Sequence, residues 1–210
     1  MKNDLYHLIH RPARALAPSP ALLVLHGWGA DEHDLLGLAP LLDDRLLIIS
    51  PRAPLALAWG YGWYHFLPER GADPAGFEAA VEDLAQFAAS LPQRYAIDPS
   101  RFFVLGFSQG AIMGVALALA QPQLVRGAVL LSGRFPTTPV SGRLDGIPIF
   151  IGHGRFDPII PATAALELEA AVRERGADVT LRLYDYGHEI RAETISDVNA
   201  WLAPRLPETG

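Results

Sequence analysis

The chain has 210 residues and 50% hydrophobic content, which is enough to bury one core, so we expect a single domain over residues 1–210. A formal net charge of −6 repels a phosphate backbone, which disfavours nucleic acid as a partner. The absence of cysteine excludes disulfides, thiolate metal sites and a cysteine nucleophile.

The N-terminal segment, Met1–His7, lacks the basic head and apolar core of a secretory signal peptide, which favours a cytoplasmic location. Short apolar runs then alternate with longer helical patterns, as in an α/β protein whose mostly parallel sheet has helices on both faces. The expected strands are Leu5–His10, Ala21–His26, Leu46–Ser50, Phe102–Gly106, Gly127–Leu131, Pro148–Gly152 and Val179–Tyr184. The expected helices are Asp34–Leu42, Gly76–Leu91, Gln109–Ala120, Ala162–Arg175 and Ile190–Leu202.

The most apolar stretch, residues 102–120, has the length of a membrane span but contains a polar turn near its start. We interpret it as a buried strand followed by a buried helix, and we expect no stable membrane insertion. Two connections rich in proline and glycine, Pro51–Pro74 and Gly133–Pro148, are too long for plain turns. Connections of this length in a compact domain are often functional.

The polar turn has the sequence Gly106-Phe107-Ser108-Gln109-Gly110, between an expected strand and an expected helix. This context is the one that a nucleophile elbow requires. The turn forces the serine into a strained backbone conformation, and the flanking glycines remove Cβ atoms that would clash. Ser108 is therefore the candidate nucleophile. The alternative is a serine that only caps the helix in a tight turn.

A serine nucleophile needs a base, and the base needs a carboxylate that fixes its tautomer; in this type of fold they follow in the order Ser, acid, His. His188 follows the last expected strand, and we expect it to be the base. Asp157 follows the preceding strand, and we expect it to be the acid. Asp185 is the nearest rival, but it lies so close to His188 in sequence that we expect it to face solvent. Most of the other histidines are interpreted as packed turn or surface residues.

The oxyanion of an acyl-transfer reaction needs two backbone N–H donors. We assign them to Gln109, the residue after the nucleophile, and to Trp28, which has glycines on both sides. The Trp28 side chain either lines the acyl pocket or covers the core. The histidines show no ligand spacing such as His-Glu-x-x-His, so we expect no metal and no organic cofactor.

Four elements of the sequence, in this order, resemble the phospholipase/carboxylesterase family of small α/β-hydrolases, which includes acyl-protein thioesterases. They are Leu25–Gly29, Gly106–Gly110, Leu131–Gly133 and His153–Pro161. The resemblance covers nearly the whole chain and implies the α/β-hydrolase fold and a carboxylic-ester hydrolase. Pro51–Pro54 and the Trp63-Tyr64 pair also resemble the family segment that shapes the substrate cleft. The resemblance thus makes Trp63 and Tyr64 pocket candidates beside Trp28.

Two positions depart from the acyl-protein thioesterases: Ala111 replaces a second glycine after the elbow, and His65 replaces an aspartate after the aromatic pair. We expect a serine carboxylesterase that hydrolyses small-molecule esters with short or medium acyl chains through an acyl-enzyme. Lysophospholipase, acyl-protein thioesterase, peptidase and acyltransferase activities stay open, because all share this triad. A binding module without catalysis is the alternative from a different class. The aromatics Trp59, Tyr61 and Trp63 line a pocket, form a homodimer interface or pack as ordinary loop residues.

Overall fold

A seven-stranded sheet forms the centre of the computed structural model, which describes residues 4–14, 16–67 and 71–208. Its order is β1-β3-β2-β8-β9-β10-β11, and every neighbouring pair is parallel except β1 with β3. The predicted mostly parallel sheet is therefore confirmed. The strands are β1 (His7–His10), β2 (Ser19–Leu25), β3 (Leu47–Pro51), β8 (Ile97–Phe107), β9 (Gly127–Leu131), β10 (Pro148–Gly154) and β11 (Asp178–Tyr184). Met1–Asn3, part of the segment on which the predicted location rests, lie outside the described residues.

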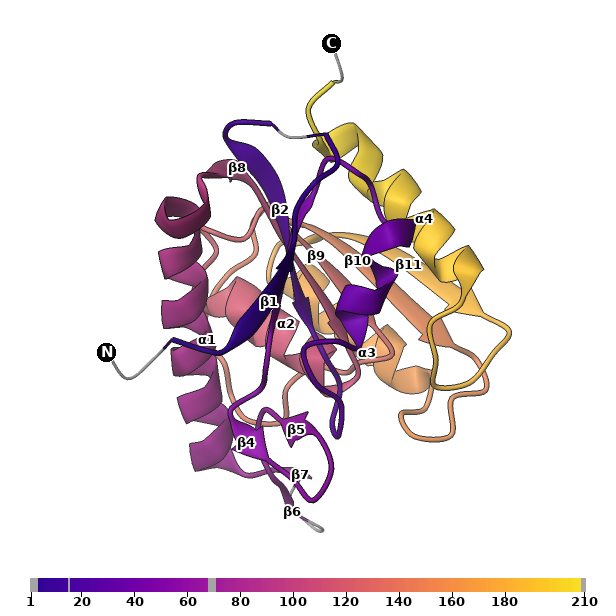
Figure 1. The fold of residues 1–210 in the computed structure, drawn as a ribbon. Helices are drawn as coiled ribbons and strands as arrows, with labels where there is room; N and C mark the ends of the chain where they lie inside the picture. The colour runs from indigo at the N-terminus through magenta and orange to yellow at the C-terminus, as the bar shows by residue number, and fades with distance from the viewer. Residues whose placement is uncertain (1–3, 15, 68–70, 209–210) are drawn as a thin grey trace.

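Helices cover both faces of this sheet, and each face has its own hydrophobic core. Helices α1, α2 and α3 pack on one face, while the 3₁₀ helix η1 and helix α4 pack on the other (Figure 1). Alternate residues of β2 serve the two cores: Leu23 and Leu25 face the first, and Leu22 and Val24 face the second. The helices are η1 (Leu35–Leu41), α1 (Pro74–Tyr95), α2 (Gln109–Ala120), α3 (Thr163–Glu174), α4 (Ala192–Leu202) and the 3₁₀ turn η2 (Ala203–Arg205).

Several expected elements differ from the structure at their ends, and two of the differences have a clear physical reason. The segment expected as the helix Asp34–Leu42 forms a 3₁₀ helix, and its interior holds Gly37 and Pro40, neither of which favours an α-helix. Strand β8 begins at Ile97, well before the expected Phe102, because Ile97 pairs with Ser19; the register shifts between this pair and the next, Ala21 with Phe102. The polar residues in between concealed this extension from a search for apolar runs.

The long connection before α1 contains two short antiparallel hairpins. The first joins β4 (Leu55–Ala56) to β5 (Tyr61–Gly62), and the second joins β6 (Phe66–Leu67) to β7 (Gly71–Ala72). In Figure 1 these hairpins lie together beyond the end of the sheet, near the end of α1 at which that helix begins. The connection is thus an ordered extension of the fold.

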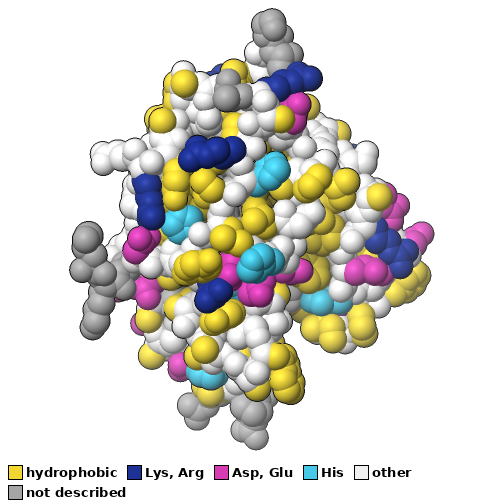
Figure 2. Space-filling model, viewed as in Figure 1, with side chains coloured by type: hydrophobic (Ala, Val, Ile, Leu, Met, Phe, Trp, Pro, Cys, Tyr) yellow, Lys and Arg dark blue, Asp and Glu magenta, His cyan; other side chains and the backbone are white. Residues whose placement is uncertain are grey.

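No helix in the described ranges is both long enough and apolar enough to span a bilayer. The apolar stretch 102–120 is divided between β8 and α2, and every residue of α2 from Gln109 to Leu119 is buried in the protein. On the face of the molecule shown in Figure 2, basic side chains are spread among acidic and apolar ones instead of gathering into one patch.

Candidate active site

Ser108 occupies the sharp turn between β8 and α2. Its backbone angles, φ 54° and ψ −118°, are ones that a residue other than glycine rarely adopts and that mark stored strain. The turn is held by the Ser108 N–H, which donates to the Leu131 carbonyl at 2.9 Å. Gly110 is needed beside it, because a Cβ atom there would lie 1.9 Å from the Leu25 carbonyl oxygen. The context expected of a nucleophile elbow is therefore present.

His188 and Asp157 form a chain of hydrogen bonds with Ser108. His188 Nε2 lies 3.0 Å from Ser108 Oγ, and His188 Nδ1 lies 2.7 Å from Asp157 Oδ2. Because an ionised carboxylate only accepts, Nδ1 carries the proton and Nε2 is left to accept the proton of the serine hydroxyl. The three residues come from the β8–α2 turn, the loop after β10 and the loop after β11. The structure thus brings together the three residues that the sequence singled out.

Asp157 is buried, and its two oxygens have separate partners. Oδ1 accepts the N–H groups of Ile159 and Ile160 at 2.8 and 2.9 Å, while Oδ2 accepts from His188. Burial alone would raise the pKa of Asp157, but the hydrogen bonds from His188, Ile160 and Ile159 outweigh it and hold this pKa below its ordinary value. The carboxyl group is therefore ionised at neutral pH, as an orienting acid must be.

The loops that carry Asp157 and His188 are in direct contact. Gly154 allows this contact, because a Cβ atom on it would lie 2.2 Å from the Gly187 carbonyl oxygen. The Arg155 N–H then donates to the Tyr184 carbonyl at 2.7 Å. Asp185, the rival acid, has a side chain that is 79% exposed and pairs with Arg155 at 3.1 Å. The separation of acid and base is thus fixed by backbone contacts, and Asp185 faces solvent.

His153 makes a contact with Asp157 that the sequence analysis missed. Its side chain is fully buried, and its Nε2 lies 2.9 Å from the Ile160 carbonyl oxygen and 3.3 Å from Asp157 Oδ2. Since a carbonyl only accepts, Nε2 carries the proton; Nδ1 has no hydrogen-bond partner in the part of the chain that the structure describes. The sequence feature that could have revealed this contact is the position of His153 in the motif His153–Pro161, four residues before Asp157.

The positions of Trp28 and Gln109 suit the backbone donors assigned to them. Gln109 is the first residue of α2, so its N–H has no acceptor within the helix. Gly27 packs against the nucleophile, since a Cβ atom on it would lie 3.4 Å from Ser108 Cβ. The N–H of Gly29 is already bonded to a carbonyl at 2.8 Å. Trp28 lies between these two glycines and lines the same cavity as Ser108.

The Gln109 side chain anchors the aromatic segment that follows β5. Its Oε1 accepts the Trp63 N–H at 2.8 Å, and its Nε2 donates to the Tyr64 carbonyl at 2.9 Å. The Trp63 indole N–H donates to the His26 carbonyl at 2.9 Å. Trp63 and Tyr64 are each only 2% exposed, and neither lines the cavity beside Ser108. The expectation that they line the pocket is corrected: both side chains are buried in the core, and their backbone binds the side chain of Gln109, which lines the cavity.

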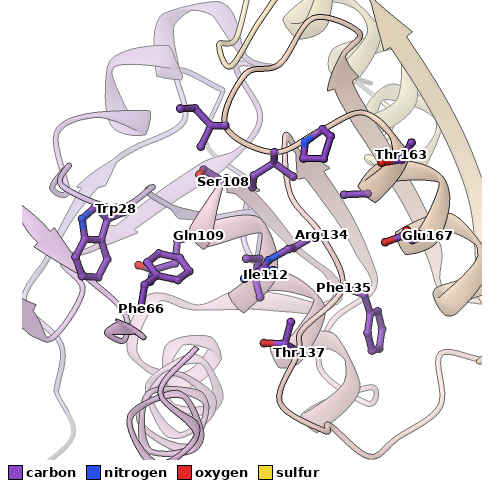
Figure 3. A pocket seen from close by; sticks show the side chains of 14 residues that line it. Trp28, Phe66, Ser108, Gln109, Ile112, Arg134, Phe135, Thr137, Thr163 and Glu167 are labelled. Atoms are coloured by element: carbon purple, nitrogen blue, oxygen red, sulfur yellow. The ribbon is translucent and has the colours of Figure 1, made fainter. Parts of the chain in front are cut away.

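A cavity of about 600 Å³ opens beside Ser108 (Figure 3). In that view Trp28 and Phe66 lie on one side and Phe135 and Glu167 on the other. The Trp28 side chain therefore lines the pocket, one of its two predicted roles. A mostly apolar lining with a few polar groups is typical of a small-molecule site. The lining residues are Trp28, Phe66, Ser108, Gln109, Ile112, Arg134, Phe135, Thr137, Ile159, Ile160, Pro161, Thr163, Ala164 and Glu167.

An ion pair between a buried carboxylate and a partly exposed guanidinium supports the loop that carries Trp28. Arg52 donates from Nε and Nη2 to the two Glu32 oxygens at 2.7 and 2.5 Å. The Glu32 side chain is fully buried, and the hydrogen bond from Arg52, opposed by burial, holds the pKa of Glu32 below its ordinary value. The guanidinium also lies over the rings of Tyr6 and Tyr61, at 4.5 and 4.6 Å from their centroids. Tyr61 thus packs against Arg52 within the fold, whereas Trp59 is 81% exposed.

One group in the described residues places three metal-ligand atoms within 4.8 Å of one another: Asp31, Glu32 and His33. Both oxygens of Glu32 already accept from Arg52, and His33 Nδ1 lies 3.3 Å from Asp31 Oδ1. These contacts account for the group without an ion, and we assign no metal to it.

Comparison with known proteins identifies the family of this chain. The sequence model of the phospholipase/carboxylesterase family matches residues 12–205. Esterase YpfH of Escherichia coli is 28% identical over 90% of this chain and 83% of its own length, and acyl-protein thioesterase 1 of Candida albicans is 26% identical over 90% and 94%. The crystal structure of the Bacillus cereus carboxylesterase superposes with a TM-score of 0.87 at 25% identity, covering 96% of this chain and 95% of that one. The chain therefore belongs to the phospholipase/carboxylesterase family and has the α/β-hydrolase fold.

Proposed function

We propose that the protein is a serine carboxylesterase that hydrolyses carboxylic esters with short or medium acyl chains. The observation that carries the proposal is the hydrogen-bonded chain Ser108, His188 and Asp157 beside the cavity, with contacts of 3.0 and 2.7 Å. The esterases among its relatives support the reaction class. A cytoplasmic location and a small-molecule ester as partner belong to the same proposal.

In the first half of the reaction, Ser108 Oγ attacks the ester carbonyl carbon while His188 Nε2 takes the hydroxyl proton. The imidazolium that forms is stabilised by the Asp157 carboxylate, which is already bonded to Nδ1. The carbonyl oxygen becomes an oxyanion, and the backbone N–H groups of Trp28 and Gln109 stabilise it. His188 then gives its proton to the departing alkoxide, so the alcohol leaves and the acyl group stays on Ser108.

In the second half, a water molecule takes the place of the alcohol. His188 Nε2 removes one proton from the water as its oxygen attacks the acyl carbon, and the same two N–H groups hold the second oxyanion. Collapse of this intermediate breaks the bond to Ser108 Oγ, which regains its proton from His188. The carboxylic acid leaves, and the free enzyme is restored.

The cavity favours small substrates. Its volume of about 600 Å³ lies within the range of small-molecule sites, and its walls include Trp28, Phe66, Ile112 and Phe135. These apolar walls suit an acyl chain of modest length. Acyl-protein thioesterase and lysophospholipase activities use the same triad, so a substrate panel must choose among them.

The experiment is hydrolysis of p-nitrophenyl esters from acetate to palmitate by the wild type and by Ser108→Ala, with fluorophosphonate labelling in parallel. Loss of the nucleophile should lower kcat by about 10⁴-fold or more and abolish labelling. Ser90→Ala removes a serine from α1, outside the cavity lining, and should behave as wild type. A panel of thioesters with matching acyl chains, together with a lysophospholipid, tests the alternative activities directly.

Turnover that peaks at short or medium chains and disappears in Ser108→Ala supports the proposal. A clear preference for the thioesters or the lysophospholipid would replace it with one of those activities. Absence of turnover and of labelling in the wild type would favour the binding module instead.

A further inference from the structure

The cavity beside Ser108 contains two charged side chains of opposite sign, Arg134 and Glu167. The described residues that form the rest of its lining are uncharged or apolar. Figure 3 shows Arg134 in the middle of the cavity lining and Glu167 at its right-hand side, on α3. A plain acyl chain needs no cation in this position.

The backbone directs Arg134 to this place. It follows β9 through Ser132, which has φ 48° and whose N–H donates to the Gly152 carbonyl at 2.8 Å. The next residue, Gly133, packs on the nucleophile turn: a Cβ atom on it would lie 3.6 Å from the Ser108 carbonyl oxygen. Arg134 therefore enters the cavity from a segment that touches the nucleophile turn and is fixed by the sheet.

Arg134 has no carboxylate partner within residues 4–14, 16–67 and 71–208, where no Asp or Glu oxygen lies within 4.0 Å of its nitrogens. The residue is half-buried. Apolar side chains, among them Ile112 and Phe135, line the same cavity. Burial raises the pKa of the Tyr64 phenol to about 12, and the positive charge of Arg134 opposes that rise. A cation in such surroundings gains more from an anionic partner than one in water.

We propose that Arg134 binds a carboxylate of the substrate, so that the preferred substrates are esters that carry a free carboxylate group in addition to the ester bond. The planar guanidinium fork matches a carboxylate with two parallel hydrogen bonds. The net charge of −6 gives no general attraction for anions, and selection of an anionic ester therefore needs a local cation of this kind. This inference rests on the proposed esterase function and specifies its substrate class.

The test compares charged and neutral esters that are otherwise matched. On the acyl side, mono-p-nitrophenyl adipate is compared with its methyl ester, and on the alcohol side, 4-acetoxybenzoate is compared with methyl 4-acetoxybenzoate. The wild type should show a higher kcat/KM for the charged member of at least one pair. Arg134→Met should reduce this kcat/KM by about 10- to 100-fold, mostly through KM, and leave the neutral member within about threefold.

Two further variants separate local binding from overall charge. Arg143→Met removes an exposed arginine that pairs with Asp145 away from the cavity, and it should not change the preference. Glu167→Gln removes the negative charge from the cavity lining, and it should raise kcat/KM for the charged ester. If Arg134→Met does not fold, the wild type still gives an answer, because kcat/KM for the charged ester should fall with added salt and that for the neutral ester should not.

The outcomes are distinct. If the neutral esters are hydrolysed and neither charged ester is preferred, or if Arg134→Met affects both members of a pair equally, the carboxylate site is refuted and the esterase function stands. If no ester is hydrolysed, the proposed function itself fails. A preference for a phosphate monoester analogue over the carboxylate would also overturn the assignment, since the site would then serve a different anion.

Discussion

Asp157→Asn tests the proton arrangement along the triad. In the wild type, Oδ1 accepts two backbone N–H groups and Oδ2 accepts from His188 Nδ1. An asparagine that keeps its oxygen on the backbone N–H groups presents its NH₂ group to Nδ1. His188 must then accept at Nδ1 and carry its proton on Nε2, facing Ser108. In that tautomer the histidine cannot take the hydroxyl proton.

The opposite orientation of the asparagine amide is disfavoured. With its oxygen toward His188, the NH₂ group would face the N–H groups of Ile159 and Ile160, donor against donor. Leaving buried donors unpaired costs about 1–3 kcal/mol each, so the first orientation should prevail. Loss of the correct tautomer lowers kcat by about 10⁴-fold in serine hydrolases with this arrangement. We expect a loss of that order here, with KM nearly unchanged.

The assay is steady-state hydrolysis of p-nitrophenyl butyrate at neutral pH, together with thermal unfolding to verify that the variant is folded. Asp185→Asn is the matched control, since Asp185 is exposed and lies near the same loops. It should retain wild-type activity. A folded Asp157→Asn enzyme with less than a tenfold loss in kcat would refute the assigned role of Asp157. Equal losses in the two variants would do the same.

The other predictions concern two buried groups that support the site. His153→Phe keeps a ring but removes the N–H that contacts Ile160 and Asp157, and we expect kcat for p-nitrophenyl butyrate to fall by about tenfold; kinetics equal to wild type would exclude a positioning role. Glu32→Gln should lower the free energy of unfolding at neutral pH by about 1–3 kcal/mol, because Arg52 loses its charged partner. Since the pKa of Glu32 is lowered by folding, this stabilisation exists above its unfolded pKa and is lost as pH falls through the folded one. The free energies of unfolding of the wild type and of Glu32→Gln, measured in urea, should converge at acid pH. A difference that stays constant with pH would contradict the stabilising role of the Glu32 charge.

Much of the fold was predictable because its central strands are buried on both faces. Strand β9 and helix α2 have the expected bounds, Gly127–Leu131 and Gln109–Ala120, since each is a continuous apolar run with a clear break at both ends. The segment at 34–42 was less predictable, because apolar spacing alone does not separate an α-helix from a 3₁₀ helix. The hairpins before α1 were not predicted, as strands of two residues carry no periodicity.

The candidate site was also predictable only in part. Ser108, Asp157 and His188 were selected because each follows a strand and the carboxyl ends of parallel strands meet at one edge. The burial of Trp63 and Tyr64 depends on hydrogen bonds to the Gln109 side chain, far away in sequence, and no local pattern encodes it. An aromatic residue in a long loop looks the same in sequence whether it lines a pocket or supports one.

The turn from Asp157 to Ile160 contributes both to the proposed triad and to the cavity beside Ser108. The backbone N–H groups of Ile159 and Ile160 hold Asp157 Oδ1, while their side chains line the cavity. Because the lining side chains and the backbone donors belong to the same two residues, a substitution that shifts this turn also moves the donors that hold the Asp157 carboxylate. Phe66 and Phe135 line the same cavity, and within the described residues neither of them makes a hydrogen bond to Ser108, Asp157 or His188. Changes of acyl preference should therefore cost little activity at Phe66 or Phe135, and much more at Ile159 or Ile160.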